Sequence, residues 1–207
     1  MTPLKVLGLA GSPRRGGNSE ILLDQALAGA TSAGAETEKL VMANLKIRPC
    51  QACDSCFETG KCILDDDMQP VHHSLLQADR IILASPIFFM SVSAQAKTVI
   101  DRCQALWATR YLLKRRHRFA SDGSRRRGLF IAVGGQDWPD VFDYARATVK
   151  AFFAVCDVEF GEELTFRGVD PKGAIRNHPT ALQDSFDAGA RLMKGSPAPA
   201  VPPGKAS

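Results

Sequence analysis

Residues 4–27 read LKVLGLAGSPRRGGNSEILLDQAL, and this stretch decides the fold. It begins with a short apolar run broken only by Lys5 and Gly8, which is typical of a buried strand in a parallel sheet. A loop over residues 11–19 follows, and then an apolar helical pattern for which Asn18 or Ser19 is the expected N-cap. A strand, a Gly/Ser loop and a helix N-terminus form an anion site, because backbone N–H groups and the helix dipole favour a phosphate.

The loop lacks two common phosphate-binding motifs, which excludes two classes of phosphate ligand. It contains no Gly-Lys-Ser/Thr, so it is not a nucleoside-triphosphate P-loop. Its glycines do not fit G-x-G-x-x-G, and the next strand ends in residues 42–44, MAN, without an acid for a ribose. Serine, arginine and asparagine side chains suit a dianionic monophosphate such as that of FMN. The alternative is an ordinary strand-to-helix turn that binds nothing.

Length and composition predict one globular domain. The chain has 207 residues, enough for a full core, with 45% hydrophobic and 23% charged residues. We expect the domain to cover residues 1–195 and residues 196–207, rich in Pro, Ala and Gly, to form a disordered tail. No apolar run reaches transmembrane length and no signal-peptide pattern is present, so the expected location is the cytoplasm, where six cysteines are not a disulfide framework.

Apolar runs alternate with helical patterns along the whole chain, which predicts an α/β fold with a doubly wound parallel sheet. The expected strands are residues 4–9, 36–41, 80–84, 128–133 and 158–166. Ligands in such sheets lie at the carboxyl ends of the strands. The loops expected at that edge are residues 11–19, 85–91 and 134–137, and the last two suit a flat ring. For Phe89 and Met90 taken singly, core packing is the favoured alternative.

Four cysteines lie within thirteen residues of a long loop, residues 47–67. The run CQACDSCFETGKC has the spacing C-x2-C-x2-C-x5-C, and similarly compact runs hold cubane iron–sulfur clusters in bacterial ferredoxins. The alternatives are zinc, an empty structural loop or redox disulfides, although a zinc site usually pairs two C-x-x-C units across a longer segment. The candidate ligands are Cys50, Cys53, Cys56 and Cys62. Cys103 and Cys156 are expected to be core thiols.

Several motifs together resemble the iron–sulfur flavoprotein branch of the NADPH-dependent FMN reductase family. They are Gly-Ser-Pro-Arg…Gly-Asn-Ser at residues 11–19, the cysteine run leading into DDDM at 65–68, ASPIFF…SVSAQ…K…DR at 84–102, and the later pattern Gly161…Leu164…Gly168…Gly173…Ile175. The resemblance covers about residues 4–193. It implies a flavodoxin-like sheet of five parallel strands in the order 2-1-3-4-5.

The resemblance also implies two cofactors and the residues that bind them. FMN phosphate contacts are implied for Ser12, Arg14, Asn18 and Ser19, and ring contacts for Pro86, Ile87, Phe88, Phe89, Gly134, Gly135 and Gln136. A [4Fe–4S] cluster is implied on the four cysteines of the run. Family members form dimers and tetramers in which a cluster lies near a neighbouring subunit's flavin. The family often has Tyr at Phe88 and Gly at Met90, and both differences lie beside the implied ring contacts.

The net charge of +4 conceals one basic segment, residues 110–127. This segment carries a charge of +7, so the remaining chain carries −3. It is either a solvated loop or a docking surface for an acidic redox protein or an anionic nucleotide. No nucleic-acid motif accompanies the charge.

The sequence therefore predicts an FMN-dependent oxidoreductase with a [4Fe–4S] cluster that couples two-electron and one-electron partners. No side chain is a credible protein acid or base for catalysis. The expected partners are NAD(P)H or a reduced ferredoxin-like donor, together with further copies of the chain as a dimer or tetramer, and no membrane. The alternatives are a clusterless NAD(P)H-dependent FMN or quinone reductase and, as a non-enzyme, a zinc-stapled module that binds nucleic acid.

Overall fold

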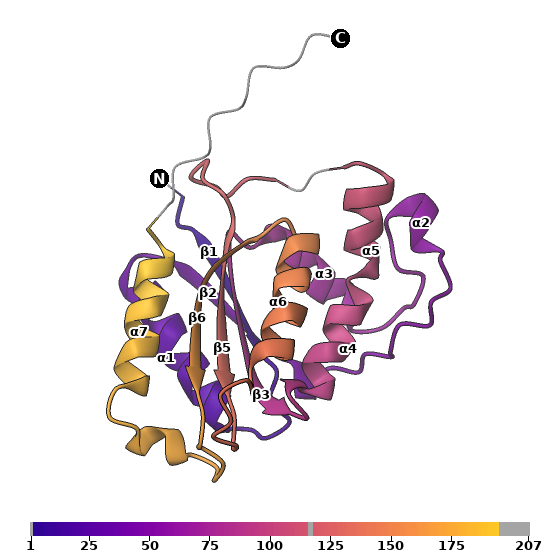
Figure 1. Cartoon of the computed structure of the whole chain (residues 1–207). Coiled ribbons are helices and arrows are strands. Elements are labelled where there is room, and N and C mark those ends of the chain that lie inside the picture. Colours follow the sequence, from indigo (N-terminus) through magenta and orange to yellow (C-terminus); the bar gives the residue numbers. More distant parts are fainter. Residues whose placement is uncertain (1, 116–117, 195–207) are drawn as a thin grey trace.

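The computed structural model describes residues 2–115 and 118–194, so the expected tail at 196–207 lies outside the described residues. A twisted sheet forms the middle layer, with helices on both faces (Figure 1). The strands are β1 (Lys5–Ala10), β2 (Glu36–Val41), β3 (Arg80–Phe88), β4 (Ser91–Val92), β5 (Arg127–Val133) and β6 (Glu159–Phe166). The main helices are α1 (Asn18–Ser32), α3 (Met68–Gln77), α4 (Ala94–Arg102), α5 (Gln104–Trp107), α6 (Asp143–Val155) and α7 (Ala181–Leu192).

The sheet has six strands rather than the expected five. Five of them are parallel in the order β2-β1-β3-β5-β6, and β4 pairs with β3 outside that path. The missed strand is only two residues long and antiparallel, with Phe88 opposite Ser91, so no periodic pattern marks it. It exists because Phe89 and Met90 adopt φ values of 49° and 62° and close a two-residue hairpin.

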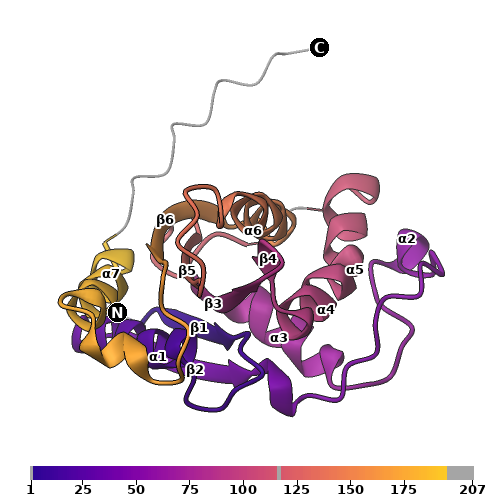
Figure 2. The same cartoon turned by 60° about the horizontal axis from the view of Figure 1, so that its bottom comes forward.

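Two apolar cores flank the sheet. One lies between the sheet and α3, α4 and α6, and the other lies between the sheet and α1 and α7. Figure 2 shows these two groups of helices on opposite faces of the sheet. The central strands β1, β3 and β5 supply side chains to both cores, which explains their near-continuous apolar sequences. Cys103 and Cys156 are buried in the first core, as expected.

Helices α1 and α7 approach each other unusually closely. A Cβ added at Gly189 would lie 1.8 Å from the carbonyl oxygen of Ala26, and a Cβ at Gly29 would lie 1.9 Å from that of Phe186. Real Cβ atoms cannot approach a backbone oxygen so closely, so only glycine fits at these two positions. The contact fixes α1, and with it the loop before it, against the carboxyl-terminal helix.

The helical stretch that follows β4 is interrupted twice. Helix α4 ends at Arg102, α5 begins at Gln104, and a π-helical turn, Ala108–Leu112, follows. Ser93 caps α4, since its hydroxyl accepts a hydrogen bond from the Ala96 N–H. In the described parts of the chain, no helix combines the length and the apolar character that crossing a bilayer requires.

Candidate functional site

The first candidate site is a hollow at the carboxyl ends of β1, β3 and β5, where the chain turns to opposite sides of the sheet. We call it the switch-point hollow; in flavodoxin-like sheets the ligand crevice lies at this point. Figure 1 has this edge at its lower end. Its walls are the loop before α1, the end of β3, the start of the loop after β5 and the loop after β6. The lining residues are Ser12, Arg14, Gly17, Asn18, Ser19, Pro86, Ile87, Phe88, Val133, Gly135, Val169, Asp170 and Lys172.

Hydrogen bonds from side chains fix the conformation of the loop before α1. The Ser12 hydroxyl accepts a hydrogen bond from the Arg14 N–H at 3.0 Å and donates one to the Arg14 carbonyl oxygen at 3.1 Å. The buried carboxylate of Glu20 accepts the Gly16 N–H at 2.7 Å and pairs with Lys39 at 3.1 Å. Burial favours a raised pKa for Glu20, but the Gly16 and Lys39 contacts outweigh it and lower the pKa. The charged Glu20 carboxylate therefore stabilises the conformation of this loop.

The start of α1 differs from the expected cap. Gly17 is the N-cap residue and no side chain caps the helix. Asn18 instead bridges to the loop after β6: its side-chain amide donates to the Pro171 carbonyl oxygen at 3.0 Å, and its side-chain oxygen accepts from the Ile175 N–H at 3.3 Å. The uncapped helix end thus faces the hollow with its dipole available to an anion.

The hydroxyl of Ser19 is a polar atom without a partner in this hollow. Ser19 is only 2% exposed, and its Oγ has no hydrogen-bond partner among the described residues. A buried hydroxyl without a partner costs stability, so such an atom in a hollow indicates a ligand that satisfies it. Ser12 is also buried, and the Arg14 guanidinium lies 3.5 Å from the Asp170 carbonyl oxygen at the rim.

A second hollow adjoins the first, and we call it the aromatic shelf. It is lined by Ile87, Phe88, Phe89, Met90, Gly135, Gln136, Trp138, Val141 and Asp170. The favoured interpretation of Phe89 as a core residue is wrong: its side chain is fully exposed at the hairpin tip, and Phe88 and Trp138 are also exposed. Gly134, one of the predicted ring contacts, lines neither hollow. Its N–H donates to the Phe166 carbonyl oxygen, and its own carbonyl oxygen accepts from the Val169 N–H.

The four cysteines of the run line a third hollow, which we call the cysteine hollow. Residues 45–67 project from the side of the sheet, with the short helix α2 (Cys56–Thr59) next to α5 (Figure 1). The hollow is lined by Cys50, Gln51, Ala52, Cys53, Asp54, Cys56, Cys62, Ile63, Leu64, Arg102, Gln104 and Ala105. All four thiols are free. Within residues 2–115 and 118–194, no three His, Cys, Asp or Glu side chains form a group that could hold a metal ion.

The loop that carries these cysteines is anchored by Asp66. Its carboxylate accepts hydrogen bonds from the Arg102 guanidinium at 2.7 and 3.0 Å, and from the backbone N–H of Arg48 and of Met68. Burial favours a higher pKa, but the Arg102, Arg48 and Met68 hydrogen bonds lower the pKa of Asp66 to about 2. Asp66 thus supplies the side-chain bond at the start of α3, and the carboxylate of Asp67 accepts the Lys46 N–H.

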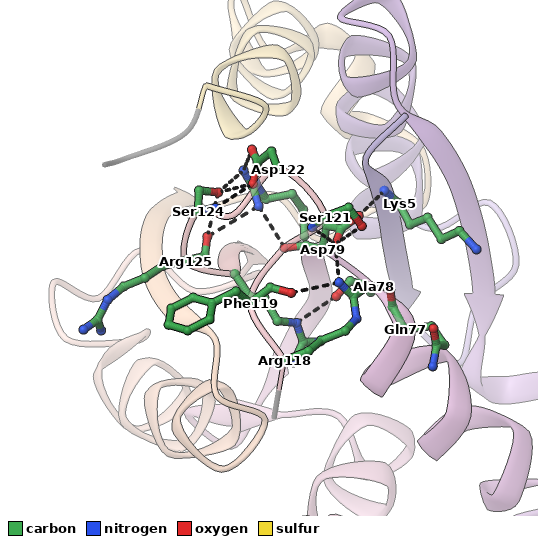
Figure 3. A network of polar contacts seen from close by, with 12 residues as sticks. Lys5, Gln77, Ala78, Asp79, Arg118, Phe119, Ser121, Asp122, Ser124 and Arg125 are labelled. Carbon is green, nitrogen blue, oxygen red and sulfur yellow. Dashed lines mark hydrogen bonds and ion pairs between the residues drawn. The ribbon is translucent and has the colours of Figure 1, made fainter. Parts of the chain in front are cut away.

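The described residues of the basic segment, 110–115 and 118–127, lie at the opposite end of the sheet from the switch-point hollow, and several of their charged side chains are bound internally. Figure 3 shows Arg118 against the fully buried Asp79, with Nη1 2.7 Å from Oδ1, and Ser121 donating to the same carboxylate. The buried guanidinium of Arg126 donates to the carbonyl oxygens of Leu75, Ala78 and Cys156. Arg110 pairs with Asp157 at 2.8 Å. Part of the charge of the described residues is thus paired or buried, whereas Lys114, Arg115 and Arg125 stay exposed.

Sequence reasoning missed the loop after β6 as part of the site. Val169, Asp170 and Lys172 line the switch-point hollow, and Trp138 lines the aromatic shelf. The sequence signal for this loop is weak: Gly168 and Gly173, both with positive φ, mark tight turns but not their position. The parallel pairing of β5 with β6 carries the loop to the same edge as the loop before α1.

Comparison with known proteins gives consistent matches. The family model described as NADPH-dependent FMN reductase matches residues 4–149. An iron–sulfur flavoprotein of Archaeoglobus fulgidus is 32% identical over 170 residues, which cover 77% of this chain and 73% of that protein. Another, from Methanocaldococcus jannaschii, is 42% identical over 103 residues, so the matched part spans about half of each protein: 50% of this chain and 53% of that one.

Solved structures with the same fold are more distant in sequence. An NAD(P)H:quinone oxidoreductase from Methanothermobacter marburgensis superposes with a TM-score of 0.73 at 17% identity, covering 94% of this chain and 98% of that one. A flavone reductase superposes with a TM-score of 0.65 at 19% identity, covering 91% of this chain and 62% of that one. At such identities the likeness supports the flavodoxin-like fold alone.

Proposed function

Since the chain belongs to the NADPH-dependent FMN reductase family, in its iron–sulfur flavoprotein branch, we propose that it is an FMN-dependent oxidoreductase. FMN would occupy the switch-point hollow, and a [4Fe–4S] cluster would occupy the cysteine hollow. When bound, the flavin supplies both two-electron and one-electron exchange and the cluster supplies one-electron exchange, so the pair suits partners of both kinds. The proposed setting is the reducing cytoplasm, in which thiolate ligands persist.

The residues of the switch-point hollow fit a phosphate. The uncapped N-terminus of α1, the buried Ser19 hydroxyl without a protein partner and the Arg14 side chain all meet at one end of it. Ser12 shapes the loop, and Asn18 ties it to the loop after β6. Lys172 adds a second cation to the lining, against the one carboxylate of Asp170, so the net charge of the lining side chains favours a dianion.

The other end of the site fits a flat ring. Ile87, Phe88 and Gly135 line both the switch-point hollow and the aromatic shelf, so the two hollows are direct neighbours. Gly135 offers bare backbone on one side, and the β3 hairpin offers apolar side chains on the other. Phe89 and Trp138 extend the apolar wall outwards, where they would exclude water from a nicotinamide or quinone partner or from a second copy of the chain.

The observation that supports the proposed cluster is that all four cysteines of the run line one hollow. They do so although the loop that holds them contains only one short helix. The Ser55 hydroxyl lowers the pKa of Cys53, which favours the thiolate that a cluster needs, whereas burial raises the pKa of Cys56. A cubane cluster is larger than an ion, so its four thiolates stand further apart than the ligands of a single metal.

The expected electron donor is NAD(P)H or a reduced ferredoxin-like protein. Self-association as a dimer or tetramer is also proposed, because Phe89 and Trp138 leave exposed aromatic surface beside the site.

The test is a metal and flavin count on anaerobically purified protein, together with the variant Cys53→Ala and the matched loop variant Gln51→Ala. We expect wild type and Gln51→Ala to hold FMN, iron and sulfide. Cys53→Ala should lose iron and sulfide while keeping FMN and a folded core. Nicotinamide-dependent flavin reduction should survive in Cys53→Ala, and one-electron delivery to a protein acceptor should collapse.

Wild type that holds FMN but no iron, with Cys53→Ala indistinguishable from it, would establish the clusterless FMN or quinone reductase instead. Zinc without sulfide would identify the cysteine hollow as a structural metal site. Protein without FMN after incubation with excess flavin would overturn the whole proposal.

A further inference from the structure

One guanidinium hydrogen in the wall of the cysteine hollow has no acceptor. Arg102, the last residue of α4, has a fully buried side chain. Its Nη1 donates to Asp66 at 2.7 Å and to the Arg48 carbonyl oxygen at 2.8 Å, and its Nη2 donates to Asp66 at 3.0 Å and to the Leu64 carbonyl oxygen at 3.5 Å. The remaining donor, Nε, is buried and has no hydrogen-bond partner among the described residues. A buried cationic N–H without an acceptor is costly, so it indicates a group that the protein holds there.

The cysteine hollow is the place where that group would lie. Arg102 lines the hollow together with all four cysteines of the run. Burial favours a lowered pKa for Arg102, but the hydrogen bonds to Asp66 and the influence of the Cys62 thiol raise it. No other arginine or lysine of the described residues lines this hollow. Arg102 is thus a cation beside the proposed ligand set, whereas Asp54 and Asp66 bring negative charge to the same region.

Both ends of Arg102 are fixed, so the direction of its Nε–H is fixed as well. The His72 ring nitrogen Nε2 lies 3.1 Å from the Arg102 carbonyl oxygen inside the core. The guanidinium is held in two places by the carboxylate of Asp66, which itself accepts two backbone N–H groups. Four of the five donors therefore serve to hold the side chain, and the fifth is left for the hollow.

We propose that Arg102 is a positioning residue for the cluster, whose Nε–H and charge act on the sulfur atoms at the Cys62 side and raise the reduction potential. The proposal rests on the proposed function, because it requires the cluster. One-electron reduction adds one negative charge without making or breaking a bond. A fixed cation and an N–H donor to sulfur stabilise the more negative state, and the acidic residues of the loop act in the opposite direction.

The experiment compares anaerobically purified full-length wild type with Arg102→Gln, Arg102→Lys and Lys97→Gln. Each cluster is titrated with dithionite under mediators and followed by EPR. Lys97→Gln is the matched control, because it removes one positive charge from the same helix at an exposed residue paired with Asp101 that does not line the hollow. Arg102→Lys keeps a charge that can reach Asp66 but has no Nε–H donor.

In Arg102→Gln, the reduced-to-oxidised ratio at a fixed potential should fall at least tenfold, which is a shift of 59 mV to lower potential for one electron. Arg102→Lys should show a smaller shift in the same direction and an altered EPR signal, and Lys97→Gln should change the ratio less than twofold. Asp66→Asn should shift the ratio the other way, because the charge of Arg102 is then no longer compensated. If Arg102→Gln does not fold, the shifts measured in Asp66→Asn and Arg102→Lys test the role of Arg102.

Equal potentials in wild type and the Arg102 variants, with iron and sulfide present in all of them, would overturn the role of Arg102 and leave the proposed cluster intact. Wild type without iron and sulfide would overturn both, and the metal count separates the two results.

Discussion

The Arg102 guanidinium binds both carboxylate oxygens of Asp66, with Nη1 2.7 Å from Oδ2 and Nη2 3.0 Å from Oδ1. This pair joins the end of α4 to the cysteine loop just before α3, and both side chains are almost fully buried. Two-point contacts between arginine and carboxylate have a fixed geometry. The position of the cysteine loop against the sheet therefore depends on this ion pair as well as on apolar packing.

The first prediction concerns acid stability. The pKa of Asp66 is about 2 in the folded protein and near 3.8 in the unfolded chain, so its contribution is complete above pH 4 and is lost as the pH falls towards 2. The full contribution is about 2 kcal/mol, and about half of it should be lost by pH 3. Urea unfolding of wild type and Asp66→Asn at pH 7, 4 and 3 measures this contribution. The difference in unfolding free energy between the two proteins should shrink as the pH falls. A difference that does not depend on pH would contradict the lowered pKa.

The second prediction concerns the buried Ser19 hydroxyl. Ser19→Ala should weaken FMN binding by about 1.5–3 kcal/mol, the value of a hydrogen bond to a charged group. It should not lower the stability of the flavin-free protein, because the hydroxyl has no partner there among the described residues. Arg14→Ala should weaken binding by a similar amount. The control is Arg15→Ala, because Arg15 is exposed and does not line the hollow. Calorimetric titration with FMN measures all three, and unchanged affinity in both Ser19→Ala and Arg14→Ala would place the phosphate elsewhere.

The third prediction concerns the hairpin tip. Met90 has a φ of 62°, a conformation that costs an ordinary L-residue about 1–2 kcal/mol, whereas glycine adopts it freely. The larger entropy of glycine in the unfolded chain offsets part of this relief, so we expect Met90→Gly to raise the unfolding free energy by about 0.5–1 kcal/mol. Met90→Ala is the control, since it removes the side chain but keeps the Cβ that causes the strain. If urea unfolding gives the same gain for both variants, backbone strain is not the cause.

The fourth prediction separates the two roles of the basic segment. Arg118→Gln should lower the unfolding free energy by about 1–3 kcal/mol, because it leaves the buried carboxylate of Asp79 without its charged partner. Neutralising the exposed Arg115 and Arg125 should leave stability unchanged. If these two belong to a docking surface, their loss slows reduction by an acidic redox protein and flattens the salt dependence of that rate. An unchanged rate and salt slope would make the segment a purely structural loop.

The pattern of buried strands and amphipathic helices was determined by the sequence, because burial on both faces of a parallel sheet demands near-continuous apolar runs. Strand β1, the loop before α1 and the cysteine run could be recognised because an apolar run, a turn and a ligand spacing each depend on residues that are close in sequence. The strand at residues 36–41 is predicted with the boundaries that the structure has.

Only the tertiary structure decided which distant residues meet. The contribution of Lys172 to the switch-point hollow follows from the pairing of β6 with β5, and the place of Arg102 beside the cysteines follows from the packing of α4. The exposure of Phe89 depends on a hairpin closed by two residues with positive φ, which no propensity scale assigns to Phe and Met. Likewise Arg118 and Arg126 read as surface charge in sequence, yet they satisfy a buried carboxylate and buried carbonyl oxygens, because desolvated polar groups need partners wherever the fold brings them.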